Sequence, residues 1–372
     1  MKSKVLIAHV LILLLSLTGN VFSKALPPGS GIGDVPANVL ILLDKSGSMG
    51  ARMTNGAGVY YPEAVAFDSN GDIYAGQYST YGIKKFTYAT NAVDSSFGSS
   101  GIYRGSGNCR SYYPRAMKVH NGYLYVAGFY QHRVFRVNLS TGVCDWNHYG
   151  IYPSSLDIKN NTLYSFNRSN LLVRNLSTNT NISCSYSGDL QNQGRYARGM
   201  AVDHNGANMY LQYYRDLYRF TIGSNKCPST TKSFKVTSPM GYYSYGMKMH
   251  PTDDSILYAT SYYSHRIYKV VLNSGKTGVQ SSTYKGSCCT GASTTSNIKM
   301  YYPRNIDIDA TNNRIAVAEY YKNSVQIFDL NLGFIKEIGG SAGTRMTGAH
   351  EAIKAIVTDS SLTSGVDFGF GY

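Results

Sequence analysis

The 372-residue sequence is poor in tryptophan and phenylalanine, with 1 Trp and 13 Phe against 34 Tyr. It also lacks any long run of basic residues, although its formal net charge is +14. Scattered Lys and Arg argue against a nucleic-acid partner and favour a solvated basic surface, with weak attraction to anionic cell surfaces as the alternative. Abundant Tyr favours short strands with amphipathic aromatic faces. The composition therefore predicts a mainly β protein.

Long apolar runs are missing after the first 25 residues. Residues 1–25 combine two early lysines, an apolar run over 5–17, and the small residues Ser23 and Ala25 before a cleavage site. This pattern is typical of a secretory signal peptide, and cleavage after Ser23 also fits. An uncleaved N-terminal anchor is the alternative. We predict a secreted or cell-surface protein with no integral membrane segment after signal cleavage.

The cysteines lack the paired C-x-x-C spacing of a structural zinc site. They are Cys109, Cys144, Cys184, Cys227, Cys288 and Cys289. In an exported protein this even number allows all of them to form disulfides, and the spacing does not choose among the pairings. Cys288 and Cys289 either bridge each other or have separate partners, and we favour separate partners.

A sequence motif recurs along the chain. It consists of Tyr, Pro and alternating apolar residues, followed by an Asn/Asp/Gly turn and further strands. Its copies begin at Tyr61, Tyr113, Tyr152, Tyr196, either Tyr243 or Tyr245, and Tyr302. The copies have the length of a four-stranded propeller blade. One blade cannot bury both of its faces, whereas a closed ring of blades can. We predict a six-bladed β-propeller over residues 57–341.

The repeat resembles the NHL family of β-propellers. Residues 303–309 with 325–329, and residues 265–270, match the family's phrase, and residues 97–101 and 338–343 resemble its connector between blades. The resemblance covers about residues 59–340. This chain differs from the family at the position after the second strand, where the family often has Asp. The residues at that position are Gly76, Gly128, Thr260 and Glu319. The resemblance therefore implies the architecture and no particular site.

The two ends of the chain look like halves of one motif. The apolar run 39–43 leads into Asp44-x-Ser46-x-Ser48, but helix-compatible apolar spacing follows only over 349–357, with a strand expected at 366–370. Residues 50–54 are nearly repeated by residues 343–347. A closed propeller brings its ends together and suits insertion into another domain. We predict that segments 26–56 and 342–372 form one domain that the propeller interrupts.

Asp44, Ser46 and Ser48 after a buried strand resemble the metal-ion-dependent adhesion site of von Willebrand factor A domains. Ligand sites of open α/β sheets lie at the carboxyl ends of strands, and these oxygen ligands suit Mg²⁺ or Ca²⁺. The alternative is a turn in which Ser side chains cap a helix. Such domains complete the site with a Thr and an Asp from later loops. We therefore expect either a longer protein or an incomplete half-site.

Several segments together resemble the type IV pilus-associated tip adhesins of Gram-negative bacteria. They are the leader, the Asp-x-Ser-Gly-Ser-Met motif, and residues 345–346, 352–353 and 366–369. The resemblance implies an adhesion protein in the periplasm or on the outer surface of a Gram-negative bacterium, with pilus components among its partners. The inserted propeller departs from the sequential arrangement of that group. The predicted fold class is thus mainly β, a six-bladed propeller inserted into an incomplete α/β von Willebrand factor A-type domain.

Tyrosine pairs recur in the loops of successive blades. Rigid amphipathic rings make contacts with proteins or glycans at little entropic cost, although packing within the blades is the favoured explanation for half of the tyrosine pairs. The predicted ligand-binding residues are the loop pairs Tyr213, Tyr214, Tyr262, Tyr263, Tyr320 and Tyr321. The partner predicted for them is a protein or glycan of a cell surface or matrix.

No catalytic residue is predicted. The alternative function is a secreted, lactonase-like six-bladed hydrolase, which would need inward-facing acidic side chains around a calcium ion. The candidates for that role are Glu63, Asp157, Asp203 and Asp307, whereas equivalent blades offer Ala116 and Met247. His132 and His265 take matching loop positions and are expected at the surface. We predict ligand binding without turnover.

Overall fold

The structure is a computed structural model that describes residues 37–41, 52–53, 58–78, 82–237, 239–241, 243–289, 293–339, 342–344 and 366–370. The predicted metal ligands Asp44, Ser46 and Ser48, and the helix predicted over 349–357, lie outside the described residues. The chain divides into two compact units, residues 51–344 and residues 1–50 with 345–372. No helix among the described residues is long and apolar enough to cross a membrane.

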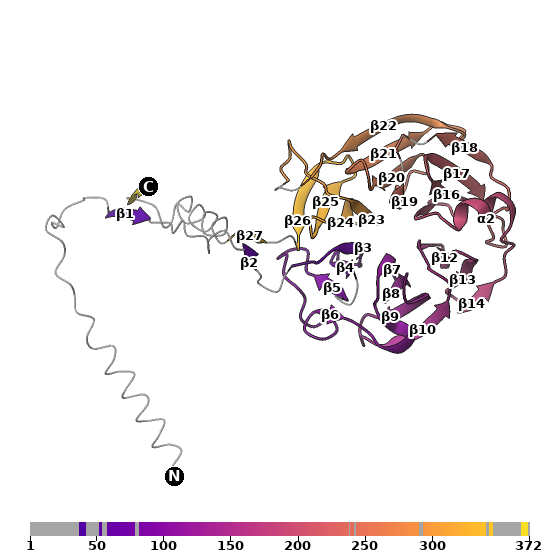
Figure 1. Cartoon of the computed structure of the whole chain (residues 1–372), viewed down its shortest axis with the longest axis horizontal. Helices are drawn as coiled ribbons and strands as arrows, with labels where there is room; N and C mark the ends of the chain where they lie inside the picture. The colour runs from indigo at the N-terminus through magenta and orange to yellow at the C-terminus, as the bar shows by residue number, and fades with distance from the viewer. Residues whose placement is uncertain are drawn as a thin grey trace, which may run out of the picture. The chain divides into compact units, whose positions relative to one another are not determined.

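The described part of the larger unit contains six antiparallel four-stranded sheets, each built from consecutive strands (Figure 1). Blade 1 has β3 (Pro62–Phe67), β4 (Ile73–Gln77), β5 (Ile83–Phe86) and β6 (Ile102–Tyr103). Blade 2 has β7 (Pro114–His120), β8 (Tyr123–Gly128), β9 (Arg133–Asn138) and β10 (Cys144–Tyr149). Blade 3 has β11 (Asp157–Lys159), β12 (Thr162–Phe166), β13 (Leu171–Asn175) and β14 (Thr180–Ile182).

The second half of the ring repeats this plan. Blade 4 has β15 (Gly199–Val202), β16 (Asn208–Tyr213), β17 (Asp216–Thr221) and β18 (Phe234–Thr237). Blade 5 has β19 (Ser244–Met249), β20 (Ile256–Ser261), β21 (Arg266–Leu272) and β22 (Val279–Lys285). Blade 6 has β23 (Pro303–Asp309), β24 (Arg314–Glu319), β25 (Ser324–Asp329) and β26 (Phe334–Ile338). The predicted mainly β, six-bladed propeller is confirmed.

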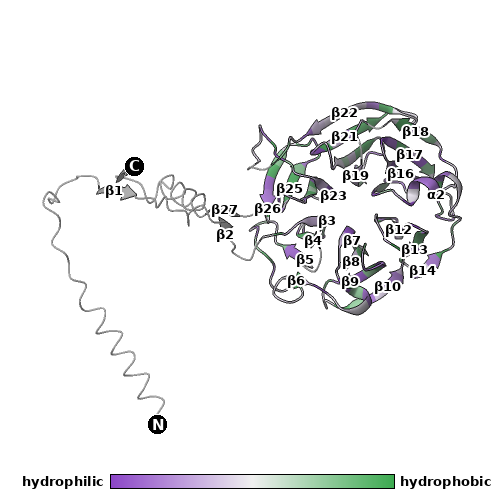
Figure 2. Cartoon of the chain, viewed as in Figure 1, coloured by the Kyte–Doolittle hydropathy of each residue, from purple (hydrophilic) through white to green (hydrophobic). Residues whose placement is uncertain are grey.

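The blades stand around a central axis, with the first strand of each blade innermost (Figure 1). Every residue of β3 and β4 is buried, because these strands pack on neighbouring blades on both faces. The outer strand β10 alternates between half-buried and exposed residues. Figure 2 accordingly shows β10 and β14 as largely hydrophilic.

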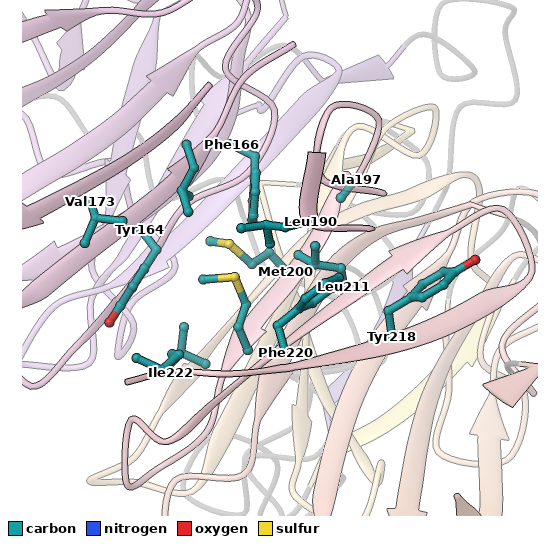
Figure 3. Packing of buried hydrophobic residues seen from close by; sticks show 13 residues of the cluster. Tyr164, Phe166, Val173, Leu190, Ala197, Met200, Leu211, Tyr218, Phe220 and Ile222 are labelled. Atoms are coloured by element: carbon teal, nitrogen blue, oxygen red, sulfur yellow. The ribbon is translucent and has the colours of Figure 1, made fainter. Parts of the chain in front are cut away.

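Apolar side chains fill the space between neighbouring blades. Between blades 3 and 4, Phe166 from β12 faces Met200 from β15 and Leu211 from β16, and all three are buried (Figure 3). A short helix, α2 (Gly188–Gly194), adds Leu190 to this cluster. Burying such side chains is the main favourable contribution to folding, so the radial arrangement itself creates the core.

The ring closes between blades 1 and 6 without exchanging a strand. The Val65 N–H donates to Asn305 Oδ1 at 3.3 Å, and the Phe67 N–H donates to Asp307 Oδ2 at 3.0 Å. These side chains of β23 thereby bond the backbone of β3. Just outside the ring, β2 (Arg52–Met53) pairs antiparallel with β27 (Ala342–Thr344). The near-repeated segments before and after the propeller therefore meet.

In the smaller unit, β1 (Ala37–Ile41) pairs parallel with β28 (Val366–Phe370). The register aligns Ala37 with Val366 and Ile41 with Phe370. Strands from the two ends of the chain thus share a sheet. A parallel pair of two strands does not by itself establish a von Willebrand factor A domain.

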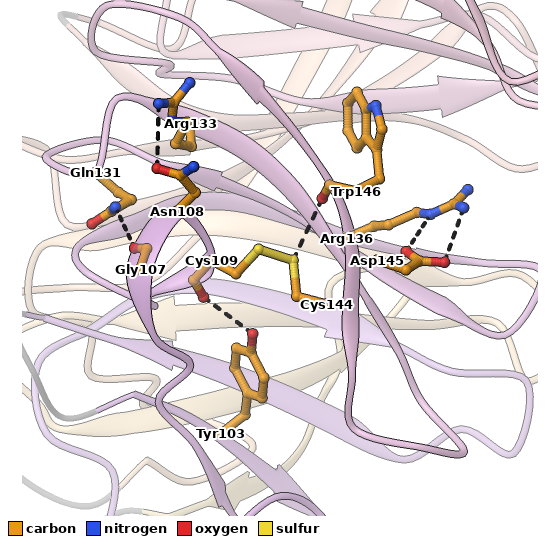
Figure 4. Close-up of a disulfide and its surroundings, with 10 residues drawn as sticks. All are labelled: Tyr103, Gly107, Asn108, Cys109, Gln131, Arg133, Arg136, Cys144, Asp145 and Trp146. Carbon is orange, nitrogen blue, oxygen red and sulfur yellow. Dashed lines mark hydrogen bonds and ion pairs between the residues drawn. A yellow bond between two sulfur atoms is a disulfide. The ribbon is translucent and has the colours of Figure 1, made fainter.

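Three disulfides lie within the described residues. Cys109–Cys144 joins a short 3-10 turn, η3 (Gly107–Cys109), to β10 of blade 2 (Figure 4). Cys184–Cys227 joins the segment after blade 3 to a loop of blade 4, and Cys288 is bonded to Cys289. The prediction of separate partners for Cys288 and Cys289 is wrong. The other four cysteines are already paired between neighbouring segments, which leaves these two to each other.

Candidate functional site at the tyrosine-rich face

Tight turns lead into the innermost strands on one face of the propeller. The tyrosines with positive φ at these turns are Tyr61, Tyr113, Tyr152, Tyr243 and Tyr302, with φ between 45° and 59°. Bulky residues rarely adopt this conformation. Four of their carbonyls accept backbone N–H groups from the loop after the second strand: Tyr61 from Tyr78, Tyr113 from Phe129, Tyr243 from Tyr262, and Tyr302 from Tyr320. The entry turns and loop tyrosines therefore lie together on one face.

The predicted loop tyrosines lie on this face but differ in exposure. Tyr214, Tyr263 and Tyr321 are exposed, by 48%, 59% and 44%. Tyr213 and Tyr262 are half-buried, and Tyr320 is buried. In each pair the first ring is buried or half-buried and the second is exposed, so each pair divides into an inner and an outer ring. Only the outer rings and the partly open inner ones are available to a ligand.

Aromatic contacts join the face into a belt. Consecutive ring centroids along it lie 4.4 to 6.3 Å apart. The members, in order of contact, are Tyr196, Tyr213, Tyr214, Tyr243, Tyr263, Tyr262, Tyr302, Tyr321, Tyr61, Tyr78, Tyr113, Phe129 and Tyr152. Mutual packing holds these rings in fixed positions, which preorganises the face for binding.

A pocket of about 400 Å³ lies where the belt is open, between Tyr152 and Tyr196. Its lining residues are Phe129, Tyr152, Ser154, Arg168, Arg195, Tyr196, Arg198, Tyr213, Tyr214 and Tyr243. Two predicted residues, Tyr213 and Tyr214, line it, and the other four do not. The combination of aromatic rings and guanidinium groups suits a ligand with both flat apolar surface and negative charge.

Three arginines meet near the propeller axis beside this pocket. Arg115 and Arg304 are the second residues of β7 and β23, and Arg198 directly precedes β15. The guanidinium carbon of Arg115 lies 5.7 Å from the centre of the Tyr245 ring. Those of Arg304 and Arg198 each lie 4.3 Å from it. Arg198 also lines the pocket and so connects it with the cluster.

One carboxylate faces these three positive charges. Glu63 in β3 is fully buried and lies 3.3 Å from Arg115 and 3.7 Å from Arg304. In the ion pairs of the described residues, Glu63 is the only carboxylate that pairs with any of the three arginines. Burial, reinforced by the charges of Arg115 and Arg304, lowers the pKa of Arg198 to about 10. The centre therefore has an excess of positive charge.

Several buried nitrogen atoms of this cluster lack hydrogen bonds. Among the described residues, Arg115 Nε and Nη1 and Arg304 Nε have no acceptor. Glu63 Oε1 and Oε2 likewise accept no hydrogen bond, and contact the arginines only as ion pairs. Buried polar groups are normally satisfied, so such atoms mark a place where a ligand or water supplies the missing partner.

The arginine cluster was not predicted, although the repeat contains its signal. Glu63, Arg115, Arg198, Tyr245 and Arg304 occupy the same position of the repeat, two residues after an entry tyrosine. The residue type changes from blade to blade, so no motif appears along the chain. Only alignment of the blades, with that position assigned to the axis, would have identified it.

Apart from Glu63, the acidic residues considered as candidate calcium ligands make hydrogen bonds within this chain. Asp157 accepts from Lys248 Nζ at 2.5 Å, and Asp307 accepts from Lys118 Nζ at 2.7 Å. Asp203 accepts backbone N–H groups of the following turn. These carboxylates hold neighbouring segments together.

The matching histidines are half-buried and not simply on the surface as predicted. His132 Nδ1 accepts the N–H of Tyr152, and His265 Nδ1 accepts the N–H of Tyr302, both at 3.1 Å. Each histidine therefore positions the entry tyrosine of the next blade. His265 also lies close to Cys288 and Cys289, but those sulfurs are joined in a disulfide and are not free thiolates.

No protein-family model and no curated protein matches the chain. Similar solved structures include virginiamycin B lyase from Staphylococcus aureus, with 12% identity over 77% of this chain and 86% of that chain, and a TM-score of 0.47. Kuenenia stuttgartiensis hydrazine synthase has 11% identity over 78% and 99%, with a TM-score of 0.49. The RRP9 WD40 repeats have 9% identity over 76% and 96%, with a TM-score of 0.51. The last similarity supports the propeller fold alone.

Proposed function

We propose that this protein is an exported adhesion or interaction protein that binds a protein or glycan of a cell surface or matrix without turnover. The observation that carries the proposal is the pocket in the opening of the aromatic belt, which Tyr213 and Tyr214 line. Export, and an association with type IV pili on a Gram-negative bacterium, are parts of the proposal that rest on the leader and on the resemblance of the chain ends.

The geometry of Tyr214 supports this role. Its ring lies 4.7 Å from that of Tyr213 and 5.3 Å from that of Tyr243, yet nearly half of its surface remains exposed. Tyr196 stacks on Tyr213 at 20° between ring planes. Rings fixed in this way lose little further entropy when a ligand covers them.

Binding of the fluorescently labelled protein to a mixed array of glycans and matrix proteins tests the proposal. Tyr214→Ala should weaken every contact that the wild type makes by about tenfold or more, as expected for an anchoring aromatic residue. Tyr284→Ala is the matched control, because Tyr284 is equally exposed but lies on the outer strand β22. Equal binding by the two variants would contradict a role for this face.

A divalent-metal site at Asp44, Ser46 and Ser48 is the second part of the proposal. The parallel pairing of β1 with β28 supports it, because that pairing brings strands from both ends of the chain into one sheet. Mg²⁺ or Ca²⁺ bound there by carboxylate and hydroxyl oxygens would leave a coordination position for an oxygen of the partner.

Isothermal titration of Mg²⁺ and Ca²⁺ into the full-length protein measures this site. We expect heat of binding in the wild type that Asp44→Ala abolishes and that Asp189→Ala, which removes a carboxylate from α2, preserves. Identical titrations of the wild type and Asp44→Ala would refute the metal site.

Three of the four acidic side chains that the hydrolase alternative would use form ion pairs with basic residues. Glu63 pairs with arginines, while Asp157 and Asp307 pair with lysines. A panel of lactones and esters provides the corresponding assay. Metal-dependent turnover that is lost in Asp307→Asn would replace the binding proposal by the enzymatic one.

A further inference from the structure

The three arginines at the propeller axis carry more positive charge than the one carboxylate paired with them among the described residues can neutralise. Arg115 and Arg304 share the carboxylate of Glu63, and Arg198 has no ion-pair partner among the described residues. The side chains of Arg115 and Arg304 are only 9% and 6% exposed. Burying like charges together costs free energy that an anion bound between them would offset.

Arg198 is placed to bring such an anion to the cluster. Its guanidinium group packs on Tyr245 together with that of Arg304, and the same side chain forms part of the pocket wall. Two further guanidinium groups, those of Arg168 and Arg195, line the pocket farther out. A guanidinium group offers a planar pair of donors that matches the two oxygens of a carboxylate or a sulfate.

We propose that Arg198, backed by Arg115 and Arg304, binds the anionic group of an acidic sugar whose ring rests on the tyrosines of the pocket. This inference rests on the proposed function and specifies its ligand class. Arg198 makes the direct contact, while the two more deeply buried arginines supply the positive potential behind it. The shared chemistry is an oxyanion on a sugar, either a carboxylate or a sulfate ester.

The shape of the site favours a sugar over an acidic peptide. The described part of the face is built from turns and strand ends (Figure 1), so these residues offer no free sheet edge along which a peptide could add as a strand. The pocket is short and localised, with a volume of about 400 Å³. Its walls combine aromatic rings, which pack on the apolar face of a sugar, with the hydroxyl group of Ser154 and the guanidinium groups.

Isothermal titration with small sugars tests the inference directly. The ligands are methyl glucuronide, the neutral methyl glucoside of the same shape, glucose 6-sulfate, and an acetylated triglutamate peptide. We expect the acidic sugars to bind about tenfold or more tightly than the glucoside. The tighter of the two acidic sugars identifies the oxyanion as a carboxylate or a sulfate ester. Added NaCl should weaken their binding and leave any binding of the glucoside unchanged.

Arg198→Gln should reduce binding of the acidic sugar by about tenfold or more. Arg198→Lys, which keeps the charge but loses the paired donors, should give an intermediate affinity. Arg136→Gln is the matched control, because this arginine pairs with Asp145 on the outer part of blade 2 (Figure 4) and has the same charge. Thermal unfolding of each variant establishes that it is folded before the titration.

The inference would be overturned if the wild type bound the glucoside as tightly as both acidic sugars. Equal losses in Arg198→Gln and Arg136→Gln would also overturn it, as would an Arg198-dependent preference for the peptide over both acidic sugars. These results are separate from those of the array experiment. If Tyr214→Ala weakens array binding but no acidic sugar binds, the inference fails and the proposed function stands. If Tyr214 has no role on the array, the proposed function itself fails.

Discussion

Glu319 is a carboxylic acid held in a fully buried position beneath the aromatic face. Its Oε2 atom accepts the N–H of Tyr301 at 2.7 Å, while Oε1 has no hydrogen bond among the described residues. Burial raises the pKa of Glu319 to about 8. The folded state therefore retains a proton that the unfolded chain releases at a pH near 4.

The raised pKa of Glu319 predicts a loss of stability on the alkaline side. Its contribution is fully present below the pKa of the unfolded chain, and it declines as the pH rises through about 8. Glu319→Gln keeps the acceptor for Tyr301 but cannot ionise. Urea unfolding at pH 6 and pH 9 should show a smaller decline for Glu319→Gln than for the wild type, by about 1 kcal/mol or more. Asp145→Asn, on the exposed edge of blade 2, should decline like the wild type, and a parallel decline in Glu319→Gln would contradict the prediction.

At the residue scale, the sequence identified part of the candidate site. Tyr213 and Tyr214 were recognisable because paired tyrosines recur in the loops, and both line the pocket. The sequence did not distinguish exposed rings from buried ones, because the direction of each ring depends on the turn that holds it. Arg198 was missed, since its role depends on Arg115 and Arg304, which lie far from it in the sequence and meet it only at the axis.

At the scale of elements, the innermost strands were the most predictable. They contain alternating apolar residues and lead into Asn, Asp or Gly turns, as β7 does at the Asn121-Gly122 turn before β8. Outer strands such as β14 have little apolar content because one of their edges and much of their surface face water. The helix α2 was not predicted, because its polar sequence GDLQNQG has only one apolar residue, Leu190, to pack into the core.

The disulfide Cys109–Cys144 should stabilise blade 2 through chain entropy. It closes a loop with a sequence separation of 35 residues, whereas Cys288–Cys289 has a separation of 1. Replacing Cys109 and Cys144 together by alanine should lower the free energy of unfolding by about 2–4 kcal/mol. Replacing Cys288 and Cys289 together should cost much less, because their bond restricts almost no chain. Equal losses in urea unfolding would contradict this account.

At the scale of the whole molecule, length and repetition were enough to predict a ring. Six similar sequence repeats, each with the length of a blade, indicated the propeller without knowledge of any contact. How the ring closes was not predictable, because it depends on specific side chains such as Asn305 and Asp307, which accept N–H groups from β3. The shared sheet of β1 and β28 agrees with an interrupted domain, while the metal-binding residues and the von Willebrand factor A fold stay predictions.

The placement of an acidic sugar on the propeller tests the central claim most directly. A crystal structure of the full-length protein soaked with the tighter-binding acidic sugar should show its carboxylate or sulfate group beside Arg198 and the sugar ring against Tyr214 or Tyr196, in the opening of the aromatic belt. Sugar density confined to the opposite face, where Asp309 and Ser140 line a separate pocket, would contradict the account.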